Sequence, residues 1–235
     1  MNDDKIILLT YRFVFSDMTE RIIALNINSE TLTLVEDTSI EKPEWTKSEF
    51  FDCKTVSCGQ IENGYCPIAL ILNRFVKLFS NLPSYEKVTT YVESNRRIYS
   101  KETSLQEGFG SLLGIMMPTS GCPTLGKLKP LAKFHLPFAS IEETEFRVFS
   151  MYLLAQYVRM QKGLEPDWEM KSLKKLYDDI QTINRTVARK IADLEKMDAS
   201  INSVIVLNNF ADSVTFSLEE NLLHFEKLFD DWLDN

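Results

Sequence analysis

The chain contains 235 residues, of which 44% are hydrophobic, 26% charged and 11% aromatic. This composition is typical of a folded globular domain, and it excludes collagen, wholesale disorder and a coiled coil as the whole structure. A chain of this length needs no disulfides, because folding buries about 70–75% of the unfolded surface. The 34 acidic residues outnumber the 26 basic ones, and the net charge of −8 argues against a dedicated binder of duplex DNA.

Residues 1–5 are acidic rather than basic and the apolar run at 6–9 is short, so the pattern predicts no secretory signal. The longest apolar stretch, at 148–160, is interrupted by polar residues and is too short to span a bilayer. We therefore expect a cytoplasmic protein without membrane association. In that compartment the four cysteines are expected to be thiols or metal ligands instead of structural disulfides.

Four segments alternate apolar and polar residues and are predicted to be strands. They are residues 6–15, 21–27, 31–35 and 85–99. The short turns between the first three favour an antiparallel meander. An apolar helix is expected to begin at Pro67, because proline suits the first position of a helix. Residues 104–138 hold five of the eight glycines and four of the eight prolines, which predicts a loop-rich region with short helices.

From residue 140 onwards the apolar period changes to that of a helix. Ser140 and Glu143 form a capping box before a helix at 141–161. Because this helix is apolar nearly all round, we expect it to be central and buried. A helix with one apolar stripe, at intervals of three and four residues, is predicted at 167–194. Two further helices are predicted from Asp198 onwards and at 218–233, the last opened by a capping box of Ser217 and Glu220.

Together these elements predict an α+β fold, in which a small antiparallel sheet packs on a C-terminal helical bundle. The N-terminal meander and the central strand would form the sheet. The change of period divides the chain into an α/β region at 1–139, with a Cys- and Gly-rich centre, and a helical bundle at 140–235. The two regions form either separate domains or one continuous domain.

Three cysteines, Cys53, Cys58 and Cys66, lie within fourteen residues, and Cys122 is the only other one. Clustered thiols in a turn-rich segment are typical of a tetrahedral zinc site, with Cys122 or His135 as the fourth ligand; an iron–sulfur cluster is the alternative cofactor. Cys66 and Cys122 each precede a proline, and at a helix start the free amides would favour a reactive thiolate. The alternative is that these thiols are inert and fill the core.

The chain has two histidines, His135 and His224. His135 precedes the glutamate-rich start of the capped helix, where a carboxylate could hold it in one tautomer as a general base. The structural alternative is that Glu143 caps this helix and pairs with Arg147 on its surface. His224, between leucine and phenylalanine, is expected to be structural or solvated. The sequence contains no Gly-x-Ser-x-Gly nucleophile elbow.

Basic residues gather around the glycine-rich centre, and Arg96, Arg97 and Lys129 are the candidate ligands of a small anion. They are expected to face a groove beside a helix that begins at Pro123, whose amides would also bind an anion. Side chains alternate along a strand, so at most one of the two arginines should point inward. The alternative is a solvated basic face. The glycines at 108–114 follow no βαβ unit and do not indicate a dinucleotide site.

Three motifs stand out in the centre of the chain. They are Cys66-Pro67-Ile68-Ala69, Ser120-Gly121-Cys122-Pro123, and His135-Leu136-Pro137-Phe138 followed by Glu143-Thr144 and Arg147. This combination resembles a family of uncharacterised bacterial proteins that is classed as a domain of unknown function. The resemblance spans about residues 50–215. It implies a bacterial cytoplasmic protein whose signature is the central Cys/Gly/His region, and it implies no activity, substrate or cofactor.

These patterns leave three interpretations of function. The first is a non-enzymatic, metal-stabilised regulatory or interaction protein, which is favoured because the sequence contains no complete catalytic set. The second is an enzyme that uses a thiol or His135. The third is a sensor of an anionic small molecule, bound through basic residues and helix N-termini. The expected partner is accordingly another protein or a small anionic ligand.

Overall fold

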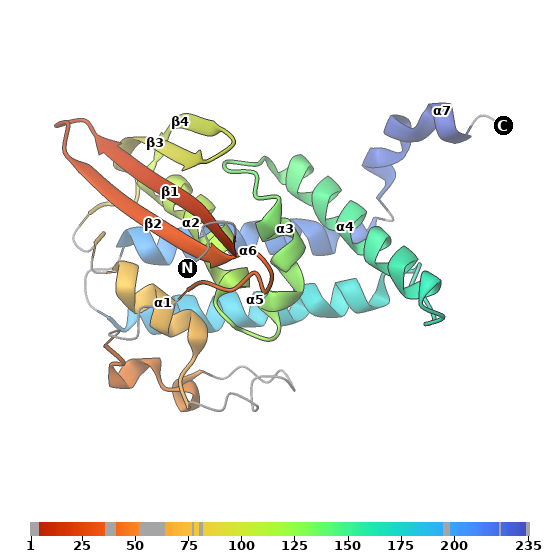
Figure 1. Cartoon of the computed structure of the whole chain (residues 1–235), viewed down its shortest axis with the longest axis horizontal. Helices are drawn as coiled ribbons and strands as arrows, with labels where there is room; N and C mark the ends of the chain where they lie inside the picture. The colour runs from red at the N-terminus through yellow and green to blue at the C-terminus, as the bar shows by residue number, and fades with distance from the viewer. Residues whose placement is uncertain are drawn as a thin grey trace.

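The computed structural model describes residues 5–35, 41–51, 64–76, 78–79, 82–194, 198–220 and 222–233. Within these residues, four strands form an antiparallel sheet in the order β2-β1-β3-β4. The strands are β1 (Ile6–Phe15), β2 (Glu20–Asn28), β3 (Lys87–Ser94) and β4 (Ile98–Ser104). Figure 1 shows the sheet towards one end of the molecule and helices α4 and α7 towards the other. The predicted α+β class is confirmed.

Helices form most of the remaining described chain. They are α1 (Pro67–Val76), α2 (Leu105–Thr119), α3 (Lys129–Lys133), α4 (Ile141–Gln161), α5 (Lys171–Ala192), α6 (Asp198–Glu219) and α7 (Asp230–Leu233), with 3-10 turns η2 (Glu44–Thr46), η3 (Ser48–Phe50), η5 (Leu125–Leu128) and η6 (Leu223–Phe229). The predicted helix starts at Pro67 and Asp198 are confirmed. Among the residues that the structure places, no helix has the length and apolarity needed to cross a membrane.

One face of the sheet is apolar because alternate strand residues point towards the helices. Tyr11 and Phe13 of β1 are fully buried, whereas Arg12 between them lies on the other face and pairs with glutamates of β2 and β3. The ring of Phe79 lies 5.1 Å from that of Phe13 and 4.7 Å from that of Phe109 in α2. These aromatic contacts join the sheet to α2 in one continuous core.

Two strand predictions are corrected. Residues 31–35 form no third strand, because Leu32 has a φ of +52° that ends the extension, and only Leu34 makes an isolated bridge to Ile27. The N–H of Leu34 instead donates to the carbonyl oxygen of Thr119 at the end of α2, at 2.9 Å. The strand predicted at 85–99 ends at Ser94, where a turn leads into the unpredicted β4.

The glycine-rich segment that was expected to be loops contains helix α2. Its glycines are explained by close packing. A Cβ built on Gly108 would lie 2.5 Å from Oγ1 of Thr90, and one on Gly110 would lie 3.5 Å from Cγ1 of Val206 in α6. Without side chains at these two positions, α2 can lie between the sheet and α6, which overrides the weak helix propensity of glycine.

The stripe predicted on α5 is buried as expected, and it packs against α6. The capping box predicted at Ser217 and Glu220 is wrong, because α6 continues through Ser217 to Glu219. Ser217 is buried inside this helix. The chain after α6 forms the short turns η6 and α7 instead of one long final helix. The apolar core includes residues from both the 1–139 and the 140–235 regions.

Helix α4 begins as predicted, with the N–H of Glu143 donating to Oγ of Ser140 at 3.1 Å and the N–H of Ser140 donating to the Glu143 carboxylate at 2.7 Å. Its first half is packed, since Val148 and Phe149 are buried. The predicted burial of its second half is wrong, because Leu154 is 64% exposed. The second half extends towards the end of the molecule (Figure 1), beyond the part of α4 that the described core covers.

Candidate functional site

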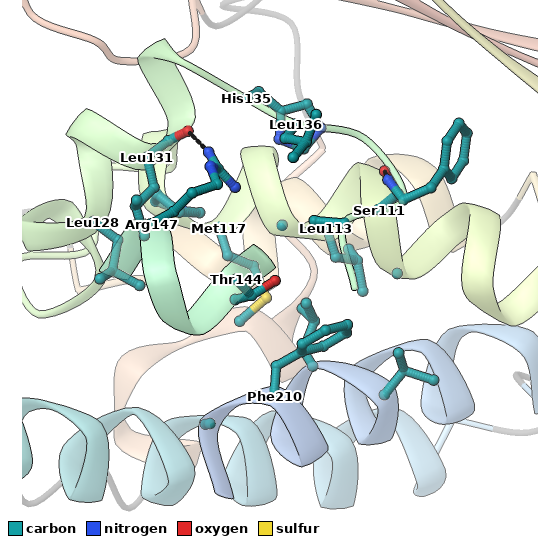
Figure 2. A pocket seen from close by; sticks show the side chains of 18 of the residues that line it. Ser111, Leu113, Met117, Leu128, Leu131, His135, Leu136, Thr144, Arg147 and Phe210 are labelled. Carbon is teal, nitrogen blue, oxygen red and sulfur yellow. Dashed lines mark hydrogen bonds between the residues drawn. The ribbon is translucent and has the colours of Figure 1, made fainter. Parts of the chain in front are cut away.

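A cavity of about 270 Å³ lies among α2, α4, α5 and α6, with α3 and the segment after it closing one side. Its walls are mainly apolar and include Leu113 and Met117 from α2, Leu131 from α3 and Phe210 from α6. Figure 2 shows Met117 from α2 and Phe210 from α6 lining the cavity, with Arg147 and His135 near Leu131. A space of this kind suits a small molecule with an apolar body.

Arg147 is the half-buried cation of this cavity wall, whereas Lys101, which also lines the cavity, is exposed. Its Nη2 donates to the carbonyl oxygen of Phe134 at 2.7 Å and to that of Leu131 at 3.1 Å. The half-buried guanidinium forms no ion pair in the described part of the chain, and burial lowers the pKa of Arg147. The predicted surface pair with Glu143 is not formed, because that carboxylate caps α4. Glu107 also lines the cavity, but its carboxylate accepts from the Thr103 hydroxyl and the Ser104 N–H and forms no ion pair with Arg147. Within the described residues the guanidinium thus faces the cavity without a directly paired carboxylate.

Helix α5 contributes a polar pair to the opposite wall. Tyr177, Ile180 and Asn184 line the cavity, and their spacing places them on one face of the helix. Asn184 is only 2% exposed, yet its amide makes no hydrogen bond within the described residues, and neither does the hydroxyl of Tyr177. Burial raises the pKa of Tyr177, although nearby Arg147 opposes this shift, so the phenol remains a hydrogen-bond donor. Two donors are thus left for a ligand.

His135 lies beside the cavity in a network of neutral groups. Its Nε2 lies 2.6 Å from the hydroxyl of Tyr11, which also donates to the carbonyl oxygen of Ser111 at 3.1 Å. Burial, and secondarily the charge of Arg147, lower the pKa of His135 to about 3, so the imidazole is neutral. Oγ of Ser111 lies 3.2 Å from the Tyr11 hydroxyl. His135 was expected to contact a carboxylate, and its partner is instead the phenol of Tyr11. The hydrogen bonds of Tyr11 link the segment after α3 to β1 and to α2.

A family comparison places the chain among known sequences. The model of a domain of unknown function, DUF6901, matches residues 9–230. The chain belongs to this family. The resemblance seen in the three central motifs is therefore confirmed, and the match extends beyond them in both directions. Comparisons with curated proteins and with solved structures gave no match. All residues of the cavity lie within the matched span, so the cavity is part of the DUF6901 domain.

The structure describes two of the four cysteines of this DUF6901 domain, since Cys53 and Cys58 lie outside the described residues. Cys66 and Cys122 are both buried. The residues beside them are close together, since a Cβ atom built on Gly121 would lie 3.9 Å from the Cβ of Pro67. Cys66 directly precedes α1 as predicted. No α-helix begins at Pro123, however, because the chain turns there before η5 starts at Leu125. Among the described residues no group of three potential ligands could hold a metal.

The zinc site remains a prediction that depends on Cys53 and Cys58 joining the buried pair. In that case, protein purified without chelator should contain one zinc per chain, and a strong chelator should lower its melting temperature, because bound metal stabilises the folded state. Replacing Cys53 and Cys58 by serine should abolish binding, whereas His135→Gln should not. Metal-free protein with a melting temperature unmoved by chelator would contradict a four-cysteine site.

The predicted anion ligands lie outside the cavity. Arg96 and Arg97 occupy the turn between β3 and β4, so the alternation expected for a strand does not apply to them. Nη1 of Arg97 donates to the hydroxyl of Tyr99 at 3.1 Å, and Nζ of Lys129 donates to the carbonyl oxygen of Thr31 at 2.7 Å. An anion held by these three residues would have to bind outside the cavity.

The sequence interpretation missed the residues that carry the cavity's polarity. Arg147 was visible in the third motif but was assigned to a surface pair with Glu143. Asn184 carried a readable signal, since it lies four residues after Ile180 and three before Val187 on the apolar stripe of α5, where a polar residue needs a partner or a ligand. Tyr177 falls on the same stripe, but its aromatic ring fits a core equally well and gave no distinguishing signal.

Proposed function

We propose that this DUF6901 domain is a binding protein for a small carboxylate with an apolar body, held in the cavity between α2 and α5. The observation that carries the proposal is Arg147, a half-buried cation that lines an apolar cavity and has no ion pair within the described residues. A buried charge without a partner is costly, and a bound anion would compensate it.

The polar groups around Arg147 favour a carboxylate over other head groups. The guanidinium presents its remaining N–H groups, and a planar fork of donors matches a carboxylate geometrically. The Tyr177 hydroxyl and the Asn184 amide can both donate, and neither has a partner among the described residues. The neutral His135 adds no second charge. The other charged residues of the lining, Lys101 and Glu107, are exposed and opposite in sign, so a ligand with one negative charge would balance the half-buried Arg147.

The rest of the wall favours an alkyl or aromatic ligand body. Side chains from three helices, among them Leu113, Met117 and Phe210, surround the space beside the polar groups. Burial of apolar ligand surface against them contributes about 25 cal/mol per Å². The volume of about 270 Å³ fits a small metabolite and excludes a nucleic acid or a folded partner.

This proposal develops the sensor hypothesis and places the anion at Arg147. The enzyme hypothesis receives less support, because Ser111 is next to the neutral phenol of Tyr11 instead of a base. Cys122 is buried and does not line the cavity. The hydroxyl of Thr103 does line it and donates to the Glu107 carboxylate, but this hydrogen bond and that from the Ser104 N–H lower the pKa of Glu107, which makes it a weak base. A role in regulation would follow if ligand binding changed a contact with another molecule.

The test uses decanoate as the probe and calorimetry as the measurement. Decanoate is expected to bind and to raise the melting temperature, whereas decanol, which has the same body without the charge, should bind much more weakly. Arg147→Gln should weaken decanoate binding by about 10- to 100-fold, since a hydrogen bond to a charged group is worth about 1.5–3 kcal/mol.

Arg147→Gln could weaken binding by disturbing the fold, because Arg147 also donates to two backbone carbonyl groups. Two further variants distinguish the loss of a ligand contact from such a folding effect. Tyr177→Phe removes only a hydroxyl that has no partner in the described chain, and it should weaken decanoate binding about fivefold to tenfold. The matched control is Arg96→Gln with Arg97→Gln, which removes exposed arginines outside the cavity and should leave binding unchanged. Equal binding of decanoate and decanol, or unchanged affinity in both Arg147→Gln and Tyr177→Phe, would refute the proposal.

A further inference from the structure

The second half of α4 carries apolar side chains that the described chain does not cover. Leu154, Tyr157, Val158 and Met160 are all exposed, and Leu164 and Trp168 extend this surface beyond the helix. Residues 154–168 are termed the α4 tip. Soluble monomers rarely expose contiguous apolar patches of this kind, and such patches commonly mark interaction sites.

A second apolar surface lies on the C-terminal residues 223–233, termed the arm. Leu223, Leu228, Phe229, Trp232 and Leu233 are exposed there, with Trp232 at 80%. The beginning of the arm already packs on the first half of α4 in its own chain. The Phe225 ring lies 5.9 Å from that of Phe146 and 6.1 Å from that of Phe149. Figure 1 shows the arm and the α4 tip projecting at the same end of the molecule.

We propose that these two surfaces bind each other between two copies of the chain, forming a symmetric dimer in which each arm packs on the α4 tip of the other copy. The first half of α4 accepts Phe225 of its own arm, so this helix already has a face suited to the arm. Further along the helix the same kind of surface continues without a covering element. A two-fold axis would create this contact twice, which is the commonest arrangement of homodimers.

The charges of the two surfaces are complementary and favour a second copy as the occupant. At the end of α4 the tip carries Arg159 and Lys162, both exposed, next to its apolar residues, whereas Glu165 and Asp167 follow in the turn towards α5. Asp167 accepts from the Tyr152 hydroxyl and from the N–H groups of Lys171 and Ser172, so it is engaged within its own chain. The arm carries three exposed carboxylates, Glu226, Asp230 and Asp231, against one exposed lysine, Lys227. An arm from a second copy would thus bring acidic groups to basic ones and apolar residues to apolar ones, which selects partner and orientation.

The same charges argue against a lipid surface as the occupant. A helix that binds an anionic membrane carries basic residues around its apolar side chains. The end of α4 has two such residues, Arg159 and Lys162, but the exposed tryptophan of the arm directly follows Asp230 and Asp231, and anionic lipid would repel these carboxylates. The whole chain has a net charge of −8. Binding to vesicles is accordingly an outcome that the experiment must be able to detect.

The experiment measures molecular mass by light scattering and sedimentation of the full chain. The wild type should have twice the chain mass of 27.2 kDa at micromolar concentrations. Two charge-reversed variants, Arg159→Glu with Lys162→Glu and Asp230→Lys with Asp231→Lys, should each be monomeric, because like charges meet at both contacts. Mixing the two variants should restore a dimer, since each contact then pairs opposite charges. Ile22→Glu, at an exposed apolar residue on β2, is the matched control and should remain dimeric.

Restoration on mixing is the decisive result, because a variant that fails to fold cannot form the mixed dimer. A wild type that is monomeric at 100 μM would overturn the proposal. The proposal would also be overturned if each charge-reversed variant stayed dimeric by itself, or if the mixture of the two variants stayed monomeric. Co-sedimentation of monomeric protein with phosphatidylglycerol vesicles would assign the two surfaces to a membrane instead.

Discussion

Replacing Gly108 by alanine is expected to reduce the free energy of unfolding by about 2–3 kcal/mol, the usual cost of overpacking a core. The added methyl group would lie 2.5 Å from Oγ1 of Thr90 and 3.1 Å from Cε1 of Phe13. Both neighbours are completely buried in the sheet and have little room to move. Helix α2 would have to shift away from the sheet, and contacts of Phe109 would be lost.

Gly114→Ala is the matched control, because this glycine lies in the same helix but the nearest outside atom would be 4.0 Å from its Cβ. Alanine there should be neutral or should stabilise by up to about 1 kcal/mol, since it favours the helix. Urea unfolding of the two variants provides the measurement. Adding Thr90→Ala to Gly108→Ala should recover part of the loss. A Gly108→Ala protein as stable as the wild type would show that α2 does not approach the sheet this closely.

The contrast between these glycines explains why the sequence interpretation missed α2. Helix and strand periods depend on neighbours along the chain, and for this reason β1, β2, the start of α4 and the stripe of α5 could be predicted. Gly108 and Gly110 weaken the local helix signal, and their benefit arises only when the sheet and α6 lie against them. That information is held in residues such as Thr90 and Val206, which are distant in the sequence.

Burial of α4 could not be predicted for a related reason. Apolar residues all round a helix indicate that it needs cover, but they do not say which element provides it. Phe149 is covered by the arm of its own chain, whereas Leu154 is left exposed. The proposed dimer would bury the apolar residues at the end of α4. The apolar composition of this helix would then reflect burial in the dimer instead of burial in the single chain.

The candidate site was predicted only in part, because its polar residues come from different helices. The motif that contains His135 and Arg147 was recognised, and both residues line the cavity. The sequence did not bring Tyr177 and Asn184 to the same site, since these residues of α5 reach the cavity only through the packing of the helices in the folded chain. A spacing rule can find ligands within one element, but a site built from several elements requires the fold.

Acid is expected to destabilise the protein through His135. Burial lowers the pKa of this imidazole from its ordinary value of 6.5 to about 3 in the folded chain. The unfolded chain therefore binds a proton more readily. The stabilising contribution is complete above pH 6.5 and is lost progressively as the pH falls from 6.5 towards 3. Between pH 7 and pH 5 the loss from this residue should be about 2 kcal/mol.

The measurement is urea unfolding at pH 7 and pH 5 for the wild type and for His135→Gln, in which the amide can still bond to the Tyr11 hydroxyl. The fall in stability between the two pH values should be about 2 kcal/mol smaller in the variant. All other titratable groups are common to both proteins, so their effects cancel in the comparison. Equal pH dependence of the two proteins would contradict a buried neutral imidazole. Because the pKa of His135 in the folded chain is about 3, its imidazole stays neutral there at pH 5 as at pH 7, so decanoate binding by the folded protein should not weaken through His135 over this range.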